Sequence, residues 1–483
     1  MNLKKSLMIL VSLFAIGYPI CADETIEIGA RLAPFFDLHC VDQIGGVEHR
    51  LHAPQAAGEA LKFDRPWEGR YCGYITVIQD EGVFRMYYRG LPQSKADGSD
   101  AETTCYAVSE DGIHWDKPNL GLYPYEGSSD NNIIISGQAP FSHNFAPFLD
   151  ANPKADPKAK YKALAGTSKT GLMGFVSSDG VVWKKLQNEP LITEGAFDSQ
   201  NVAFWSESEG KYCCYLRTWT KGEFSGYRTI SRSTSDDFIH WTQPVEMSFG
   251  EPLQEHLYTN QTHPYFRAPH IYISLAARFM PGRRILSAEQ FQKIGGEAAY
   301  SGDCSDTVLL TSRGGTQYDR TFKESLIRPG LGWENWSSRS NYTACGVIPT
   351  GPAEMSMFVQ RRYGQLDHYL ERFQIRMDGF ASMHADFTGG EFVTKPLLFT
   401  GGELALNVST SAAGSVKIEL QNAEGKPIDG FTLDASDLFV GDAINAIASW
   451  KGSSDVSRLS GKPVKLRFVM KDADLYSFQF RRP

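Results

Sequence analysis

The feature that most constrains this chain is a repeated pattern of short strands and tight turns. Alternating or apolar runs are separated by Gly, Asn, Asp and Pro residues through most of the sequence, as is typical of β-strands joined by hairpins. Five such units of three or four predicted strands begin near Gly73, Phe145, Asn201, Tyr258 and Tyr342. Because a unit of this size cannot bury its faces alone, the repeat predicts an all-β, five-bladed β-propeller.

A short motif marks the last hairpin of the first three units. Its residues are Ser109, Asp111, Gly112 and Trp115 in the first, Ser178, Asp179, Gly180 and Trp183 in the second, and His240 and Trp241 in a variant in the third. Asp and Gly tolerate the positive φ of a tight turn. We expect the tryptophans to pack between adjacent blades, so the motif is interpreted as scaffold.

After Met383 the sequence changes to short strands separated by glycines. Strands of this spacing are typical of a β-sandwich. The predicted organisation is a catalytic propeller over residues 23–386, followed by a C-terminal β-sandwich over residues 387–483.

The N-terminus has the pattern of a secretory signal peptide over residues 1–22. Two lysines precede the apolar run Leu7–Ile16, which is too short to span a membrane, and cleavage fits after Ala22. Ile20 is larger than the residue that usually precedes a lipidated cysteine, which argues against a lipid anchor at Cys21. The sequence therefore predicts a secreted or periplasmic protein with no integral membrane segment.

Composition excludes some partners and leaves others open. The net charge is −8 and no basic block occurs, which argues against nucleic acid as a partner. Aromatic residues make up 12% of the chain, enough to supply the ring faces that carbohydrate sites use. No metal-binding spacing appears, the presence of a central cation is left open by the sequence, and no cofactor is expected. Seven cysteines remain after the predicted cleavage, and one disulfide is left open.

A topological rule ranks the polar residues. The first strand of each propeller blade starts near the central cavity, so residues just before these strands converge there. Before the first unit, Asp64 lies next to Arg65, and a neighbouring cation lowers the pKa of a carboxyl and keeps it ionised, as a nucleophile or base requires. Trp67 and Glu68 in the same turn are candidate substrate-binding residues.

The second and third units place further candidates at the predicted cavity. His143 and Asn144 precede the second unit, and either side chain is suited to bind a sugar hydroxyl. Asp198 precedes the third unit and is a candidate catalytic carboxylate. Gln200 and Asn201 follow it in a polar run typical of a hydrogen-bonding sugar site.

The fourth unit contains the predicted general acid, Glu255. Partial burial beside Tyr258 would raise its pKa so that it keeps a proton near neutral pH, and Glu251 is the competing candidate. Tyr258, Asn260 and His263 are candidate substrate-binding residues.

The fifth unit supplies Arg339 as a substrate anchor and Glu354 as a second acid or an arginine partner. Hydrolysis of a glycosidic bond needs two carboxyl groups across that bond, roughly 5 Å apart for retention and about 6.5–9.5 Å apart for inversion. The predicted catalytic set is Asp64, Asp198 and Glu255, and their separation is left open by the sequence.

At these residues the chain resembles the five-bladed glycoside hydrolases of families 32, 68, 43 and 62, and is most similar to bacterial family-32-like proteins. Asp64 in FDRPWEG occupies the place of the family 32 nucleophile, Asp198 in FDSQNVAFW that of its transition-state stabiliser, and Glu255 that of its acid. The resemblance implies a propeller with a C-terminal sandwich and activity on glycosidic bonds.

The favoured function is an exo-acting glycosidase that takes a terminal sugar from a polysaccharide or glycan. One alternative is a glycoside phosphorylase, whose phosphate site would draw on Arg65, Arg339, His143 and His263. The other is a propeller that binds glycans without catalysis, because a fold alone does not establish activity.

Overall fold

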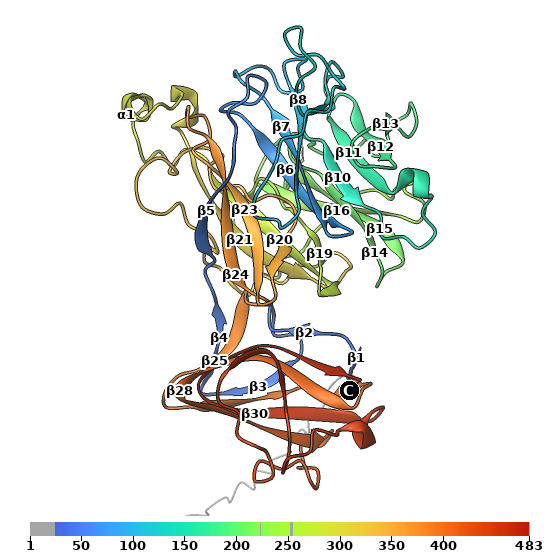
Figure 1. Ribbon diagram of the computed structural model, residues 1–483, viewed down its shortest axis with the longest axis vertical. Helices are drawn as coiled ribbons and strands as arrows, with labels where there is room; N and C mark the ends of the chain where they lie inside the picture. The colour runs from blue at the N-terminus through green and yellow to red at the C-terminus, as the bar shows by residue number, and fades with distance from the viewer. Residues whose placement is uncertain (1–24, 223, 252–254, 483) are drawn as a thin grey trace, which may run out of the picture.

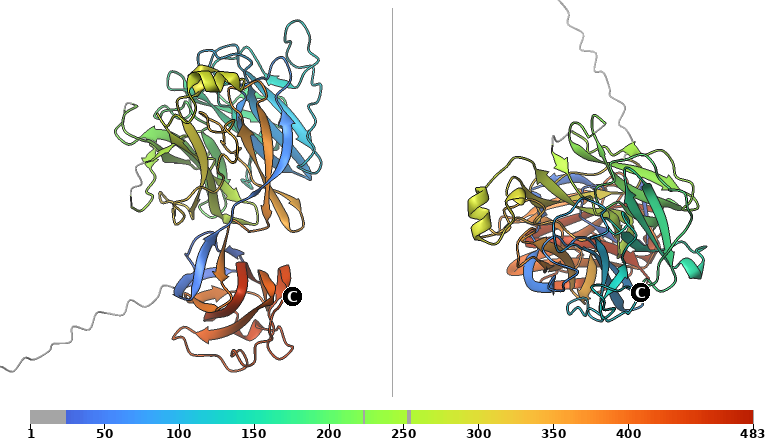
Figure 2. Two further views of the ribbon diagram at one scale, coloured as in Figure 1. Left: turned by 90° about the vertical axis from the view of Figure 1, so that its left-hand side faces the viewer. Right: turned by 90° about the horizontal axis from the view of Figure 1, so that it is seen from above.

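The computed structural model describes residues 25–222, 224–251 and 255–482. It contains a propeller and a smaller β-sheet domain, which lies below the propeller in both side views (Figures 1 and 2). The predicted signal peptide lies outside the described residues, so the secreted location stays a prediction. No helix in the described ranges is long and apolar enough to cross a membrane.

The first three blades are four-stranded antiparallel sheets whose strands follow chain order. Blade 1 contains β6 (Gly73–Asp80), β7 (Val83–Gly90), β8 (Thr103–Ser109) and β9 (Ile133–Ile135). Blade 2 contains β10 (Ala146–Leu149), β11 (Tyr161–Thr167), β12 (Gly171–Ser177) and β13 (Lys184–Lys185). Blade 3 contains β14 (Val202–Ser206), β15 (Lys211–Trp219), β16 (Arg228–Ser235) and β17 (Val245–Glu246).

Blade 4 is irregular because its inner edge is split. The short strands β18 (His256–Leu257) and β19 (His263–Tyr265) both pair with β20 (Ala268–Met280), which pairs on its other edge with β21 (Cys304–Ser312). The helix α1 (Ala288–Lys293) lies between β20 and β21, at the end of the propeller far from the second domain (Figure 2).

Blade 5 closes the ring with a strand from the other end of the chain. Its strands are β22 (Ile348–Gly351), β23 (Glu354–Arg361), β24 (Tyr369–Arg376) and β5 (Gln55–Lys62). The outermost strand, β5, pairs with β24 from Tyr369 opposite Lys62 to Gln374 opposite Gln55. The five-bladed arrangement predicted from the repeat is confirmed, and β5 joins the first and last parts of the propeller by backbone hydrogen bonds.

The repeated turn motif acts as scaffold, as expected. In the first copy, the Asp111 carboxylate accepts hydrogen bonds from the backbone N–H groups of Ile113 and His114, both at 2.8 Å. In the second copy, the serine that bonds the turn aspartate is Ser177 rather than the predicted Ser178. Trp183 packs edge-on against Tyr87 of blade 1, so the tryptophan of one blade contacts its neighbour.

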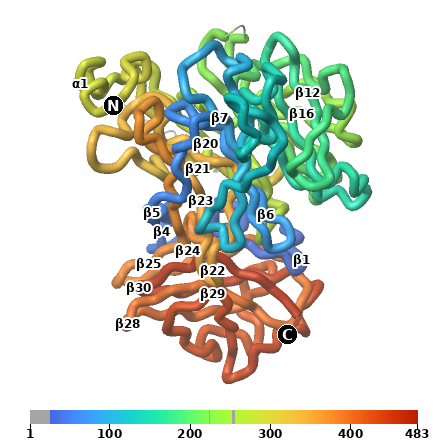
Figure 3. Tube along the Cα trace, turned by 45° about the horizontal axis from the view of Figure 1, so that its top comes forward, coloured from blue at the N-terminus to red at the C-terminus, as the bar shows by residue number. Residues whose placement is uncertain are grey.

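The second domain takes strands from both ends of the chain. Its N-terminal strands are β1 (Ile26–Gly29), β2 (Ala33–Pro34), β3 (Val41–Gly45) and β4 (Val47–Leu51). Its C-terminal strands are β25 (Ala381–Ala385), β26 (Gly390–Thr394), β27 (Leu397–Phe399), β28 (Glu403–Asn422), β29 (Asp442–Ile447) and β30 (Pro463–Arg481). All ten belong to one folded sheet, in which β4 pairs with β25 (Figure 3).

The predicted domain boundaries therefore need correction. Residues 26–51, which the sequence assigned to the propeller, pair with the C-terminal strands, and β25 also belongs to that sheet although it precedes residue 387. Side chains from both segments share one core, in which Phe35 packs against Phe392 and Phe478. The predicted boundary failed because short N-terminal strands carry no signal of their distant partner.

The cysteines are buried small side chains, and none forms a disulfide in the described part of the chain. They are Cys40, Cys72, Cys105, Cys213, Cys214, Cys304 and Cys345.

A buried carboxylate joins the two domains. Asp378 follows β24 and is fully buried. It accepts hydrogen bonds from the Tyr265 hydroxyl at 2.6 Å and from the Arg267 guanidinium, both in blade 4. It also accepts hydrogen bonds from Ser477 at 2.8 Å and Asn407 at 3.2 Å in the second domain.

We predict that Asp378→Ala lowers the free energy of unfolding by about 3 kcal/mol, because it leaves buried donors and the Arg267 charge without their acceptor. Chemical denaturation followed by intrinsic fluorescence measures the change. The matched control is Asp434→Ala, at an exposed aspartate, which should shift the transition little. Equal denaturation midpoints for the two variants would contradict the stabilising role of Asp378 between the domains.

Candidate functional site

A pocket opens on the propeller axis, where the loops before several first strands meet. Its cavity volume is about 30 Å³. Its lining residues are Gly73, Tyr74, Arg89, Leu91, Ser94, Lys95, Asp97, His143, Asp198, Tyr300, Arg339, Tyr342, Gln360 and Tyr363. Three residues singled out from the sequence, His143, Asp198 and Arg339, are among them.

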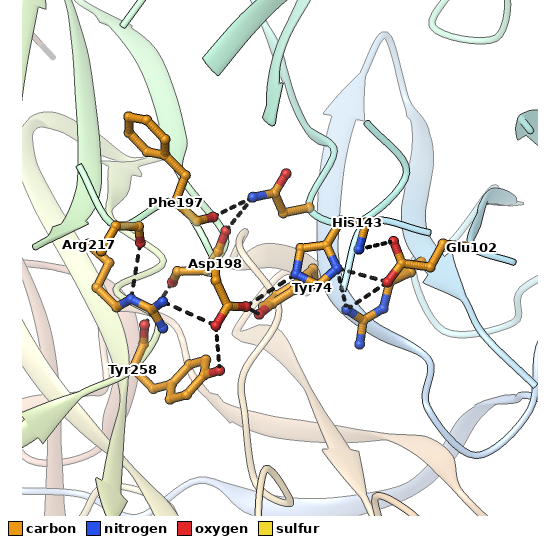
Figure 4. A network of polar contacts seen from close by, with 12 residues as sticks. Tyr74, Glu102, His143, Phe197, Asp198, Arg217 and Tyr258 are labelled. Carbon is orange, nitrogen blue, oxygen red and sulfur yellow. Dashed lines mark hydrogen bonds and ion pairs between the residues drawn. The ribbon is translucent and has the colours of Figure 1, made fainter. Parts of the chain in front are cut away.

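Asp198 is the centre of a polar network in this pocket (Figure 4). One carboxylate oxygen accepts hydrogen bonds from His143 Nε2 at 3.2 Å and from the Tyr74 hydroxyl at 3.4 Å. The other accepts from the Arg217 guanidinium at 3.2 Å and from the Tyr258 hydroxyl at 3.4 Å. The side chain is still 39% exposed, so the network leaves the carboxylate accessible from the pocket.

The surroundings of Asp198 favour its charged form. Burial alone would raise the pKa of this carboxyl, but the hydrogen bond from His143 and the charge of Arg217 hold it well below its usual range. The Arg339 charge lowers it further. Asp198 is therefore a carboxylate at neutral pH, able to serve as nucleophile or base.

His143 lies between two carboxylates and is fully buried. Its Nδ1 is 2.8 Å from Glu102 Oε1, and its Nε2 faces Asp198. Burial lowers the pKa of the imidazole, but the hydrogen bonds to Asp198 and Glu102 outweigh burial and raise it overall. A protonated His143 donates from both nitrogens, which fixes the orientation of Asp198.

Two further candidates hold the backbone around Asp198 rather than a ligand. Asn144 Nδ2 donates to the carbonyls of Phe197 and Ser199 at 2.6 and 3.0 Å. Asn201 Nδ2 donates to the same two carbonyls at 3.0 and 2.9 Å. Both asparagines are buried, and they position the loop that carries Asp198.

Tyrosines form the walls of the pocket. The lining contains Tyr74, Tyr300, Tyr342 and Tyr363. Tyr258 lies beside Tyr342, with ring centres 5.4 Å apart, and its hydroxyl reaches Asp198. Tyr74 has a φ of 51°, in the left-handed region that bulky residues rarely adopt. Such backbone strain is concentrated at functional sites, where the surrounding structure enforces it.

Arginines surround the same pocket. The Arg89 guanidinium donates to the Tyr71 carbonyl at 3.1 Å and lies 3.8 Å from Glu102. Arg217 pairs with Asp198 and also donates to the Ala196 carbonyl at 3.1 Å. Arg339 is stacked among tyrosine rings, with its guanidinium carbon 5.3 Å from the centre of Tyr300.

Asp97 brings a second accessible carboxylate to the pocket. Ligand atoms of Asp97, His143 and Asp198 all lie within 4.8 Å of one another, a spacing compatible with a divalent cation. A cation would require an unprotonated Nε2 on His143, whereas both nitrogens of this ring face carboxylates. Because Arg217 and Arg339 already offset the charge of Asp198, the arrangement fits a protonated His143 better than a metal.

The predicted convergence of Asp64 with Asp198 is not observed. The Asp64 side chain is 60% exposed and forms an ion pair with Lys117 at 3.0 Å, outside the axial pocket. Its pKa is lowered as expected, because Lys117 outweighs the effect of burial, and Arg65 contributes less.

Lys117 also binds Glu68 at 2.6 Å, and Glu68 is fully buried, so it is structural. Trp67 donates to Asn132 at 2.8 Å and is likewise structural.

Glu255 also lies away from the pocket. It accepts hydrogen bonds from the Arg320 guanidinium at 3.0 and 3.3 Å and is 3.6 Å from Arg278. The predicted position in the pocket beside Tyr258 is therefore wrong: its partners are two arginines that lie 23 and 65 residues away in the sequence. Tyr258 itself reaches Asp198 instead.

The remaining candidates are structural. Gln200 donates to Thr76 and accepts from Gln261 across the axis. Asn260 donates to the Tyr215 carbonyl. Burial lowers the pKa of His263 to about 4, and its Nε2 accepts from the Val347 backbone. Glu354 pairs with Arg372 at 3.0 Å within blade 5.

Sequence reasoning missed Arg89 and Arg217, which end the second strands of blades 1 and 3. A second strand runs antiparallel to the first, so its last residues return to the axis: Arg89 lies opposite Gly73. The signal was present as an arginine at the end of an aromatic-rich strand in MYYR and CYLR. Tyr74, Asp97 and Glu102 gave no such signal.

No protein-family model matches the chain, and no curated protein matches it. Solved structures are similar in part. One described as a glycoside hydrolase is 10% identical, with 66% of this chain and 92% of that chain covered and a TM-score of 0.44. An N-acetylgalactosamine deacetylase from F. plautii, in complex with blood group B trisaccharide, is 13% identical, with 69% and 97% covered and a TM-score of 0.42. A β-1,2-mannobiose phosphorylase from Listeria innocua is 10% identical, with 66% and 95% covered and a TM-score of 0.40. The resemblance to families 32, 68, 43 and 62 stays a prediction.

We predict that His143 remains protonated at pH 6.5 and somewhat above, because its pKa is raised. Burial lowers the pKa values of His263 and His368 to about 4, so these two rings should be neutral at pH 6.5. Ring signals of ¹³C-labelled histidine, assigned with His143→Asn, measure the titrations. Glu102→Gln should lower the pKa of His143, because it removes one of its two charged partners.

The raised pKa of His143 makes the stability of the fold depend on pH. A histidine whose folded pKa is raised stabilises the fold fully below its unfolded pKa, and this stabilisation is lost as pH rises through the folded pKa. Unfolding transitions of wild type and His143→Asn should therefore converge at alkaline pH. A His143 signal that titrates below pH 6.5 would contradict this assignment.

Proposed function

We propose that this protein cleaves a terminal sugar from a glycan in its axial pocket, with Asp198 as the essential carboxylate. The observation that carries the proposal is an ionised, 39% exposed carboxylate held in a pocket with tyrosine walls. Sites for small ligands are concave and combine aromatic walls with a few fixed polar groups. Tyrosine faces cover the C–H surface of a sugar ring, and their hydroxyls bind its oxygens.

Asp97 is the best-placed partner for Asp198. Its ligand oxygen lies within 4.8 Å of that of Asp198, close to the roughly 5–5.5 Å between the carboxyl groups of retaining enzymes. In this mechanism Asp198 attacks the anomeric carbon while Asp97 donates its proton to the departing oxygen. Asp97 then takes a proton from water, whose oxygen displaces Asp198 from the sugar. This step returns a proton to Asp97 and frees Asp198 as a carboxylate, so both groups end the cycle in their starting states.

A glycoside phosphorylase is the second candidate. Inorganic phosphate would then attack the anomeric carbon, so only one carboxyl group would be needed. The arginines around Asp198 favour this alternative, because they could bind the phosphate. Incubation of the protein with a cleaved glycan in the presence and absence of phosphate distinguishes the two, since phosphorolysis yields a sugar phosphate and hydrolysis the free sugar.

We predict that Asp198→Asn reduces turnover by at least about 10³-fold, because the amide can act neither as nucleophile nor as base. A screen for released sugar over a panel of polysaccharides and oligosaccharides identifies the substrate, and kcat of each variant is then measured on it. Asp97→Asn should also lower kcat, because the amide can neither protonate the departing oxygen nor accept the proton of the attacking water.

The matched controls are Asp64→Asn and Glu255→Gln, which change the carboxylates outside the pocket and should keep kcat within about twofold. Full activity of Asp198→Asn would overturn the proposed role of Asp198. Loss of activity in a correctly folded Asp64→Asn or Glu255→Gln would return those residues to the mechanism.

A further inference from the structure

Arg339 is a partly buried cation in the lining of the axial pocket. Within the described residues, its guanidinium forms no hydrogen bond or ion pair. Its contacts are the faces of Tyr258, Tyr300 and Tyr363, at 5.9, 5.3 and 5.9 Å from the guanidinium carbon to the ring centres. Stacking on aromatic faces leaves the five N–H donors at the edge of the guanidinium free to bind an acceptor.

The backbone holds Arg339 in this position. Its φ is 61°, and Asn341 two residues later has a φ of 70°. Asn341 Nδ2 donates to the Ser305 carbonyl at 2.8 Å, while its side-chain oxygen accepts from Arg361. An arginine in the left-handed region persists only where the surrounding contacts enforce it. The segment therefore presents a fixed guanidinium to the pocket.

The charge of the pocket is positive overall. Arg89, Arg217 and a protonated His143 carry three positive charges, against the two negative charges of Glu102 and Asp198 with which they pair. The other charged residues of the lining are the cations Arg339 and Lys95 and the anion Asp97. A neutral sugar would leave the Arg339 donors without a charged acceptor.

We infer that Arg339 binds an oxyanion in the axial pocket: a carboxylate or sulfate group carried by the terminal sugar, or free inorganic phosphate. The guanidinium fork matches two oxygens of any of these groups. The inference rests on the proposed function only for its location, since oxyanion binding is measurable without turnover. The inference narrows the expected reaction from cleavage of any glycan to two cases. Either the terminal sugar carries an anionic group, or phosphate is the attacking group.

Calorimetric titration at low ionic strength tests the inference with four probes: inorganic phosphate, sulfate, D-galacturonate and, as the neutral match, D-galactose. At least one oxyanion should bind wild type tenfold or more tightly than galactose. Arg339→Asn, which suits a positive φ but lacks the charge, should weaken that binding at least tenfold. Arg339→Lys should weaken it less, and Arg65→Gln, which removes an arginine outside the pocket, should leave it unchanged.

Asp198→Asn separates this inference from the proposed function. Removing a negative charge from the pocket should strengthen oxyanion binding severalfold while it abolishes turnover. An active enzyme that binds no oxyanion better than galactose would overturn the inference and leave the proposed function standing. Oxyanion binding that depends on Arg339, without cleavage of any glycan, would overturn the proposed function and leave the inference standing.

The source of the anion follows from which probe binds. Preference for galacturonate or sulfate over phosphate assigns the anion to the sugar. Preference for phosphate, together with release of a sugar phosphate, assigns it to the attacking group. Equal binding by wild type and by folded Arg339→Asn and Arg339→Lys would overturn the role of Arg339 whichever probe is used.

Discussion

The chain of charges from Glu102 through His143 and Asp198 to Arg217 is the interaction on which the site depends. Its members come from blades 1, 2 and 3, and they meet only because the ring brings the inner ends of those blades together. Buried charges are costly unless each finds a partner. Here each carboxylate has a cation and the imidazole has two carboxylates, so the network both tolerates burial and fixes the direction of Asp198.

The ring that gathers these groups is itself held by long-range pairing. Strand β5 completes blade 5 through β24, and the Asp378 contacts tie blade 4 to the second domain. A propeller closed in this way keeps its inner strand ends at fixed positions. The polar network therefore sits on a rigid frame, and the tyrosine and arginine side chains around it need no large rearrangement to form the pocket.

Much of the fold was predictable because its signals are local. The five units and the Asp-turn motif follow from periodicity and turn chemistry within a few residues. The site was only partly predictable, for the opposite reason. His143, Asp198, Tyr258 and Arg339 were found by the rule that first strands start at the axis. Asp64 and Glu255 obey the same rule in sequence, but Lys117, Arg320 and Arg278 hold them elsewhere, and those partners are 53, 65 and 23 residues away.

The two ends of this polypeptide are interleaved with each other in both domains. Because β5 pairs with β24 and β1–β4 pair with strands that begin at residue 381 or later, the propeller closes only after residue 376 is made, and the second domain is complete only when its last strand is added. The second domain is therefore assembled late, and the nascent chain exposes the unpaired edges of β1–β4 until then. A fragment cut at residue 376 would retain every blade but leave β1–β4 without partners, so we expect the propeller expressed without the C-terminal strands to expose strand edges and aggregate.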